Sequence, residues 1–304
     1  MFAVFQPIQN VLYTDYLHNN SANFNGLDKL EDLIKLIGPP QWPWQVDANL
    51  ATQGQAIYNR PGSCAGCHGI KPGEFRSIFS ETWATPVQNV GTDTREYDIM
   101  GWTAQTGALE GSYIPGVTEP LKANDQTFNI LTTAVLGSIT QHYLTSSGIF
   151  AAEPPKIAAN TRVPSQLSGR LPPQLRNLTG AFRPPAGVSR GADAPAAAAA
   201  PPHGAYESRV MQGIWAAAPY LHNGSVPTLA ELLKKPADRV KKFKVGPAYD
   251  IVNVGLAADQ TMFDYELQTG CGDINSGNSN CGHDFGTDLS DQEKKALLEY
   301  LKTL

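Results

Sequence analysis

The sequence predicts a mainly α-helical fold with long irregular loops. Apolar residues recur at helical spacing in several segments, and the last segment opens with a helix-capping signal. The chain of 304 residues also carries 28 glycines and 23 prolines, which divide it into many turns. With 41% hydrophobic and 17% charged residues the composition is that of a globular protein, long enough for one or two domains.

The helices follow from these signals in chain order. Leucines and isoleucines at helical spacing predict a short amphipathic helix over residues 26–37, and Gly38-Pro39-Pro40 ends it. The tryptophans that follow, Trp42 and Trp44, are expected to pack against a nearby surface. A second helix is expected over residues 48–59, a longer one over residues 125–144 and a short one after Pro227.

The final helix begins at Ser290, where Ser290 and Glu293 have the spacing of a capping box, and it continues to the end of the sequence. Gly54 lies inside the second predicted helix, where glycine costs about 1 kcal/mol relative to alanine. Such a glycine is explained if another helix passes closely. We therefore expect the final helix to cross the second one at Gly54.

Charge and hydropathy exclude two classes of partner. The net charge of −5 is too small to indicate nucleic-acid binding or a membrane-surface patch. No apolar run reaches the roughly 20 residues that a membrane-spanning helix requires, so no membrane span is predicted.

The strongest chemical signal is Cys64-Ala65-Gly66-Cys67-His68, a C-x-x-C-H motif. This pattern is typical of c-type haem attachment, in which two cysteines form thioethers and the histidine binds iron. The alternatives are a redox-active dithiol and half of a zinc site. A zinc site would need a second Cys/His pair at short spacing, and the sequence has none. A thioredoxin motif would follow an apolar strand, whereas the segment before this motif is helix-like and ends in a Pro-Gly turn. One covalent haem c is therefore the predicted cofactor.

A second axial ligand is less clear from the residues. His222 and His283 are the main candidates, and His222 can equally be a turn histidine that hydrogen-bonds the Asn223-Gly224 backbone. The weaker candidates are His18, His142, His203, Met211 and Met262.

Cys271 and Cys281 flank a Gly/Asn/Ser-rich loop just before His283. A disulfide there would steady the segment that carries this histidine, contributing about 2–3 kcal/mol. Free thiols, or a cation site formed by Asp273 and nearby carbonyls, are the alternatives.

The segment Gly213–Leu233, GIWAAAPYLHNGSVPTLAELL, resembles dihaem c-type cytochromes of the rubber-oxygenase and bacterial cytochrome c peroxidase group, and the rubber oxygenases more closely. The ending GHDFGTDLSDQEKKALLEYLKTL resembles the C-terminus of the same group. The resemblance extends from about Trp44 onward and excludes a Pro/Ala-rich insert around residues 183–204. It implies a cytochrome c-like haem domain over residues 46–304, after an irregular N-terminal segment over residues 1–45.

Proteins of that group have two cytochrome c-like domains, each with a C-x-x-C-H motif, whereas this sequence has one. The resemblance matches the motif to the C-terminal, electron-transfer haem, and it implies a bis-histidine site. His283 is then the preferred distal ligand for His68, and His222 lies near the haem face or an interdomain surface. Residues 1–45 are interpreted as the possible remnant of a truncated upstream domain.

The expected function is electron transfer, with a donor or acceptor protein or small molecule as partner. The alternative is a haem peroxidase or oxygenase acting on peroxide or a hydrocarbon, which an upstream haem domain would favour. Covalent haem and a disulfide indicate a periplasmic or secreted protein. The first 20 residues lack the basic and small-residue features of a signal peptide, which also suggests a missing N-terminal portion.

Overall fold

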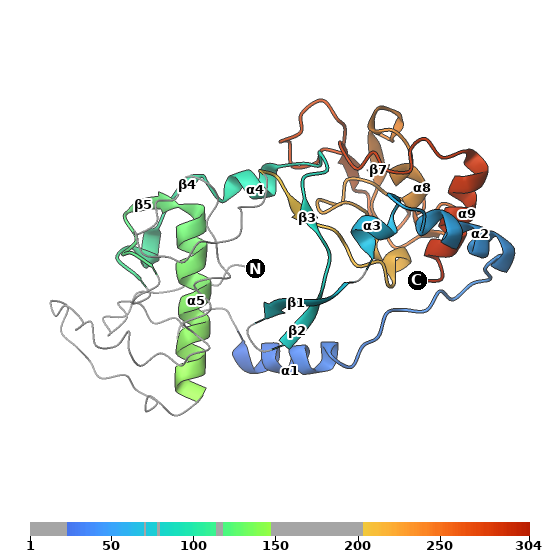
Figure 1. Cartoon of the computed structure of the whole chain (residues 1–304). Helices are drawn as coiled ribbons and strands as arrows, with labels where there is room; N and C mark the ends of the chain where they lie inside the picture. Colours follow the sequence, from blue (N-terminus) through green and yellow to red (C-terminus); the bar gives the residue numbers. More distant parts are fainter. Residues whose placement is uncertain (1–22, 70, 78–79, 114–117, 147–202) are drawn as a thin grey trace. The chain divides into compact units, whose positions relative to one another are not determined.

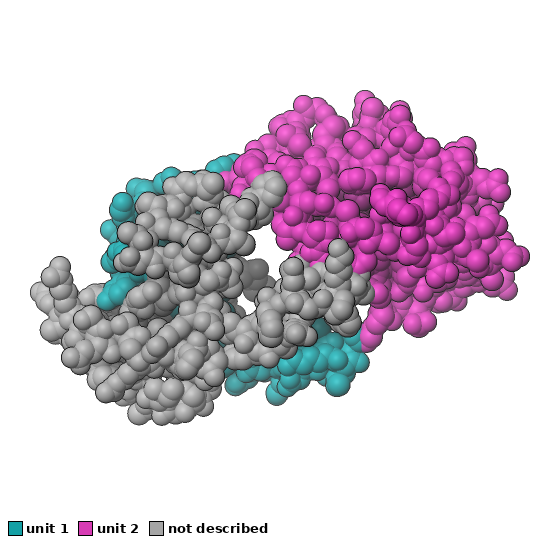
Figure 2. Space-filling model, viewed as in Figure 1, with its two compact units in different colours: residues 1–37, 99–200 teal, residues 38–98, 201–304 magenta. Residues whose placement is uncertain are grey.

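The computed structural model describes residues 23–69, 71–77, 80–113, 118–146 and 203–304 (Figure 1). The chain forms two compact units (Figure 2). One comprises Met1–Ile37 with Ile99–Ala200, and the other Gly38–Asp98 with Pro201–Leu304. His18 and nearly all of the Pro/Ala-rich insert lie outside the described residues.

In the first unit, helix α5 (Thr127–Ser146) is the longest described element. It follows the short antiparallel pair β4 (Thr103–Gln105) and β5 (Asn124–Gln126), with the 3-10 helix η1 (Gly107–Leu109) between the strands. Helix α1 (Phe24–Ile34) contacts α5 through Phe24, whose ring stacks on that of His142 at 4.8 Å. A small core of Leu109 and Leu121 packs against Ile130 and Ala134.

The second unit contains all the residues of the predicted haem site. Its helical elements are α2 (Ala48–Tyr58), α3 (Ala65–His68), η3 (Ile214–Ala217), α8 (Leu229–Leu232), η4 (Pro236–Asp238) and α9 (Asp291–Leu301). The short helix α4 (Arg95–Ile99) lies where the chain leaves this unit.

The strands of the second unit are short and form two-stranded antiparallel sheets. They are β1 (Lys71–Ser77) with β2 (Ser80–Ala84), β3 (Val87–Gln88) with β6 (Tyr206–Glu207), β7 (Lys242–Lys244) with β10 (Glu266–Gln268), and β8 (Tyr249–Asp250) with β9 (Gly255–Leu256).

The prediction of a mainly α-helical fold is wrong. Among the described residues, five two-stranded sheets lie between the helices, and α3, α4 and α8 have only four or five residues each. Helix nucleation fixes several residues for a single hydrogen bond, so the short segments between glycines and prolines cannot sustain helices. Instead, segments such as Lys242–Lys244 and Glu266–Gln268 pair with each other as strands, and the backbone N–H and C=O groups form hydrogen bonds across the pair.

Helices α2 and α9 cross at Gly54, as predicted. A Cβ atom on Gly54 would collide with the carbonyl oxygen of Ala296 and lie 2.8 Å from Cβ of Tyr300. Next to the crossing, the rings of Tyr58 and Tyr300 are 5.3 Å apart. The absence of a side chain at Gly54 therefore allows the helix before the cysteine motif to pack directly on the last helix of the chain.

The predicted capping box is also confirmed, and a second helix cap is seen at Asp47. Ser290 and Glu293 form a complete capping box at the start of α9. At the start of α2, Asp47 accepts hydrogen bonds from the backbone N–H groups of Asn49 and Leu50, and its own N–H donates to Glu299 at 3.0 Å.

The main core joins α2, α8 and α9 to the segment around η3. Its buried members are Tyr58, Ile214, Tyr220, Val226, Leu229, Leu233, Val254, Leu297, Leu298 and Leu301. Trp42 and Trp44 pack with Trp215 and Tyr249 on this core, which confirms their expected role.

None of the helices in the described ranges combines the length and apolar character needed to cross a bilayer.

Candidate haem-binding site

The C-x-x-C-H motif forms one tight helical turn after α2. Cys64 is the N-cap of α3, and its carbonyl oxygen accepts hydrogen bonds from the N–H groups of Cys67 at 3.1 Å and His68 at 2.8 Å. The two thiols are free and half-buried. This turn presents two thiols that are in no disulfide and an imidazole from five consecutive residues, as haem attachment requires.

His68 is oriented by a distant part of the chain. Its Nδ1 lies 2.7 Å from the carbonyl oxygen of Arg209, and its own carbonyl oxygen accepts a hydrogen bond from the Tyr58 hydroxyl at 3.3 Å. A carbonyl oxygen only accepts, so this contact places a proton on Nδ1, and in the neutral imidazole Nε2 is then the nitrogen with the free lone pair. Metal-bound histidines are typically held in this way.

His283 is carried by a loop with an unusual backbone. Gly282 and His283 both have positive φ angles, 73° and 51° respectively, and the N–H of His283 donates to the carbonyl of Val90 at 2.9 Å. A Cβ atom at Gly282 would overlap the carbonyl group of Gly91 and lie 2.5 Å from the nitrogen of Thr92. Glycine at position 282 therefore allows the loop before α4 to support the histidine.

The centroids of the His68 and His283 rings are 6.1 Å apart, and the ring planes are tilted by 51° to each other. An imidazole nitrogen binds a metal at about 2 Å and lies about 1.1 Å from the ring centre, so two imidazoles on opposite sides of one metal ion have centres about 6 Å apart. The observed separation of His68 and His283 matches this value. The side chains present therefore fit an iron bound between them.

His283 differs from His68 in its surroundings. Its Nδ1 is buried without a hydrogen-bond partner. Burial, together with the nearby His68 and Arg239, lowers the pKa of His283 to about 4. The imidazole is therefore neutral at pH 7, the form that coordinates a metal.

His222 lies in a different environment from the His68–His283 pair. It is exposed, and its ring stacks on that of Tyr206 with centroids 3.9 Å apart. The residues that follow it have a structural role, because Asn223 Nδ2 and Ser225 Oγ both donate to the carbonyl oxygen of Ser279, at 2.9 and 2.8 Å.

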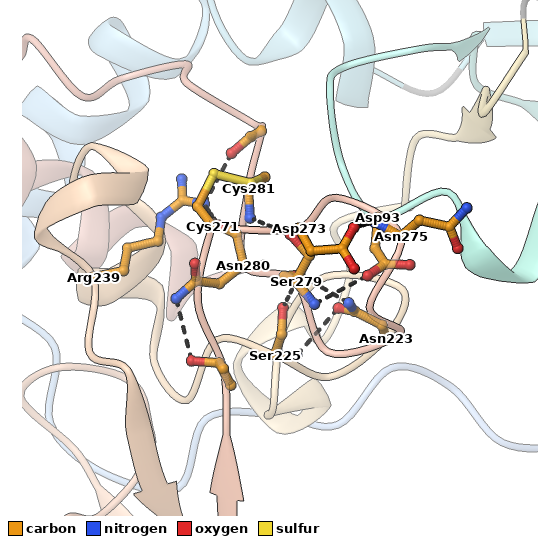
Figure 3. The surroundings of a disulfide bond; sticks show 12 residues. Asp93, Asn223, Ser225, Arg239, Cys271, Asp273, Asn275, Ser279, Asn280 and Cys281 are labelled. Atoms are coloured by element: carbon orange, nitrogen blue, oxygen red, sulfur yellow. Dashed lines mark hydrogen bonds between the residues drawn. A yellow bond between two sulfur atoms is a disulfide. The ribbon is translucent and has the colours of Figure 1, made fainter.

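A disulfide joins Cys271 to Cys281, two residues before His283 (Figure 3). Asp93 is 1% exposed, and one of its carboxylate oxygens accepts hydrogen bonds from the N–H groups of Gly277 at 2.9 Å and Ser279 at 3.0 Å. The disulfide loop is thus held by the covalent bond, by the Asp93 carboxylate and by the residues that follow His222.

The weaker ligand candidates have other contacts. Nε2 of His203 lies 2.6 Å from a carboxylate oxygen of Asp98, and His142 packs on α1. Met211 packs against the core and Met262 is exposed. Within the described ranges, no three His, Cys, Asp or Glu side chains cluster to hold a metal ion.

No signal in the sequence singles out Arg239. It lies among several lysines in KKPADRVKKFK, yet the structure buries it beneath the loop that carries His283. The carbonyl oxygens of Arg209 and Val90, which hold the two histidines, were also missed, because a backbone group carries no residue-specific signal.

Residues 205–244 match the family model described as RoxA-like, cytochrome c-like. The chain is 29% identical to "Uncharacterized protein y4iJ" of Sinorhizobium fredii over 88% of its length, which covers 41% of that protein. It is 36% identical to "Uncharacterized protein y4iM" of the same organism over 32% of its length, covering 27% of that protein. The chain thus spans less than half of each of these relatives. The match over residues 205–244 confirms the resemblance to the C-terminal haem domain of rubber-oxygenase-like cytochromes.

Proposed function

We propose that this chain is an electron-transfer c-type cytochrome that carries one haem, attached through Cys64 and Cys67 and ligated axially by His68 and His283. The observation that carries the proposal is the 6.1 Å separation of the two imidazole rings, which suits axial ligands on one iron. The cytochrome c-like match over residues 205–244 supports the same cofactor.

Each residue of the site has a defined task in this proposal. The carbonyl oxygen of Arg209 orients His68, so that Nε2 is available to iron. Burial keeps His283 neutral, and its loop holds the ring on the opposite side. Bound haem supplies a one-electron redox centre. With four positions of the iron taken by the porphyrin nitrogens, His68 and His283 would fill the remaining two, and peroxide or oxygen would find no open position. This favours electron transfer over catalysis at this site.

We further propose a periplasmic or secreted location, because haem attachment and the Cys271–Cys281 disulfide both suit an oxidising compartment. The redox partner is then a donor or acceptor protein, or a small redox-active molecule, of that compartment.

The proposal is tested by producing the protein in a bacterial host that exports it and attaches haem. Haem should remain on the polypeptide after denaturation and acid–acetone extraction, and the pyridine haemochrome spectrum should be that of two thioether links. The double variant Cys64→Ser/Cys67→Ser should lose the covalent pigment. The matched control, Cys271→Ser/Cys281→Ser, removes two cysteines elsewhere and should retain it. Wild-type protein without covalent pigment, or with bound zinc, would refute the proposal.

A further inference from the structure

Arg239 is a buried cation whose hydrogen bonds all go to the backbone. The residue is 3% exposed and lies just after η4, in the segment that matches the cytochrome c-like family. No carboxylate among the described residues forms an ion pair with its guanidinium, although Asp284 and Glu231 lie near enough to partly offset the lowering of its pKa by burial. A buried charge of this kind is costly unless every donor is satisfied.

Five carbonyl oxygens surround the guanidinium. Two come from the end of α8 and the residues after it: Leu232 at 3.2 Å and Lys234 at 3.2 Å. The other three come from the loop that carries the distal histidine: Asn280 at 2.5 Å, Gly282 at 2.9 Å and His283 at 3.1 Å. These contacts use all of the N–H donors that a guanidinium possesses.

The contacts connect a fixed element to the ligand loop. Helix α8 is anchored in the main core by Leu229 and Leu233. The loop has no regular structure at residues 280–283, and His283 has a positive φ angle that side chains rarely adopt. Hydrogen bonds to the carbonyl of His283 and to that of the preceding glycine hold this backbone conformation, and with it the direction of the imidazole.

We propose that Arg239 is a positioning residue of the haem site, which holds the loop 280–283 against α8 so that His283 stays opposite His68. The proposal rests on the proposed bis-histidine ligation. Lysine can replace arginine in this role only in part, because a single ammonium group has three donors and cannot reach five carbonyl oxygens on two segments.

The test uses the haem-loaded protein and a readout that depends on release of the distal ligand. Carbon monoxide binds ferrous haem only when the sixth position is open, so its binding rate after dithionite reduction reports how readily His283 leaves the iron. Arg239→Gln should bind carbon monoxide at least tenfold faster than wild type, and Arg239→Lys should be intermediate. His283→Ala gives the upper limit.

Two controls separate positioning from general effects. Lys241→Gln removes an exposed positive charge two residues away and should bind carbon monoxide at the wild-type rate. Asp47→Ala removes the cap of α2, which weakens the fold elsewhere, and should also leave the rate unchanged.

The outcomes distinguish this inference from the function on which it rests. If His283→Ala behaves like wild type, the bis-histidine ligation is wrong. If His283→Ala is fast while both Arg239 variants remain as slow as wild type, the ligation stands and the positioning role is refuted. Should Arg239→Gln fail to accumulate with haem, Arg239→Lys alone decides, since a wild-type rate in that variant would refute the role.

Discussion

The carbonyl oxygen of Arg209 lies 2.7 Å from Nδ1 of His68, although 141 residues separate the two in the sequence. Arg239, 30 residues further along, donates a hydrogen bond to the carbonyl oxygen of His283 at 3.1 Å. The segment that matches the cytochrome c-like family therefore contacts both proposed iron ligands without containing either of them. In the proposed site, this segment orients the two histidines.

The crossing of α2 and α9 leaves no room for a side chain at Gly54. Gly54→Ala should lower the free energy of unfolding by at least about 1 kcal/mol, because the new methyl group would collide with the backbone carbonyl of Ala296. Chemical denaturation followed by circular dichroism measures the change. Gly38→Ala is the control, since a Cβ atom there meets nothing within 4 Å. Equal stability of Gly54→Ala and wild type would show that the helices do not pack this closely.

The buried carboxylate of Asp93 should be a major support of the disulfide loop. Asp93→Ala leaves the N–H groups of Arg95, Gly277 and Ser279 without their acceptor, and buried unsatisfied donors cost about 1–3 kcal/mol each. We expect a loss of about 3 kcal/mol or more in the free energy of unfolding, measured in urea. Asp288→Ala removes a carboxylate that is 86% exposed and should cost less than about 0.5 kcal/mol. Similar losses in the two variants would contradict this role.

Loss of the Cys271–Cys281 disulfide should lower stability without releasing haem. For a loop of this length the expected loss is about 2–3 kcal/mol, because the bond restricts the unfolded chain. Thermal unfolding of Cys271→Ser/Cys281→Ser, monitored in the oxidised protein, gives the value. A double variant as stable as the wild type, or thiols that react freely in the wild-type protein, would show that the bond does not form.

Glu293 should make stability depend on pH in the acidic range. Its hydrogen bonds with Arg60 and with Ser290 lower the pKa of the folded carboxyl below the ordinary 4.5. The folded state then binds this proton more weakly than the unfolded state, so the contribution of Glu293 is complete above pH 4.5 and is lost as the pH falls through the folded pKa. The stability difference between wild type and Glu293→Gln should therefore shrink below pH 4.5. A difference that stays constant with pH would contradict the lowered pKa.

The sequence predicted the helices that have strong local signals. The capping box at Ser290, the glycine at position 54 and the apolar spacing of residues 48–59 identified α2, α9 and their crossing, because each signal lies within a few residues. The fold class was wrong because pairings such as β3 with β6 join residues more than 100 positions apart. No local periodicity indicates such a pairing in strands of two or three residues.

The sequence predicted the side chains of the candidate site, but not the residues that hold them in place. A C-x-x-C-H motif is typical of haem attachment, so it could be recognised from five residues alone. The structure brings His68 and His283 together. Arg239 looks like one more surface cation in a lysine-rich stretch, and its burial follows only from the fold. The same holds for Asp93, whose partners Gly277 and Ser279 contribute backbone groups alone.

The most direct test of the account is the spin state of the ferric haem, measured by electron paramagnetic resonance at low temperature. The wild-type protein should be low-spin, with the signals of two axial imidazoles. His283→Ala should become high-spin, whereas His222→Ala should keep the wild-type spectrum, because His222 stacks on Tyr206. A low-spin, unaltered spectrum in His283→Ala, or a high-spin spectrum in the wild-type protein, would contradict the proposed pairing of His68 with His283 on one iron.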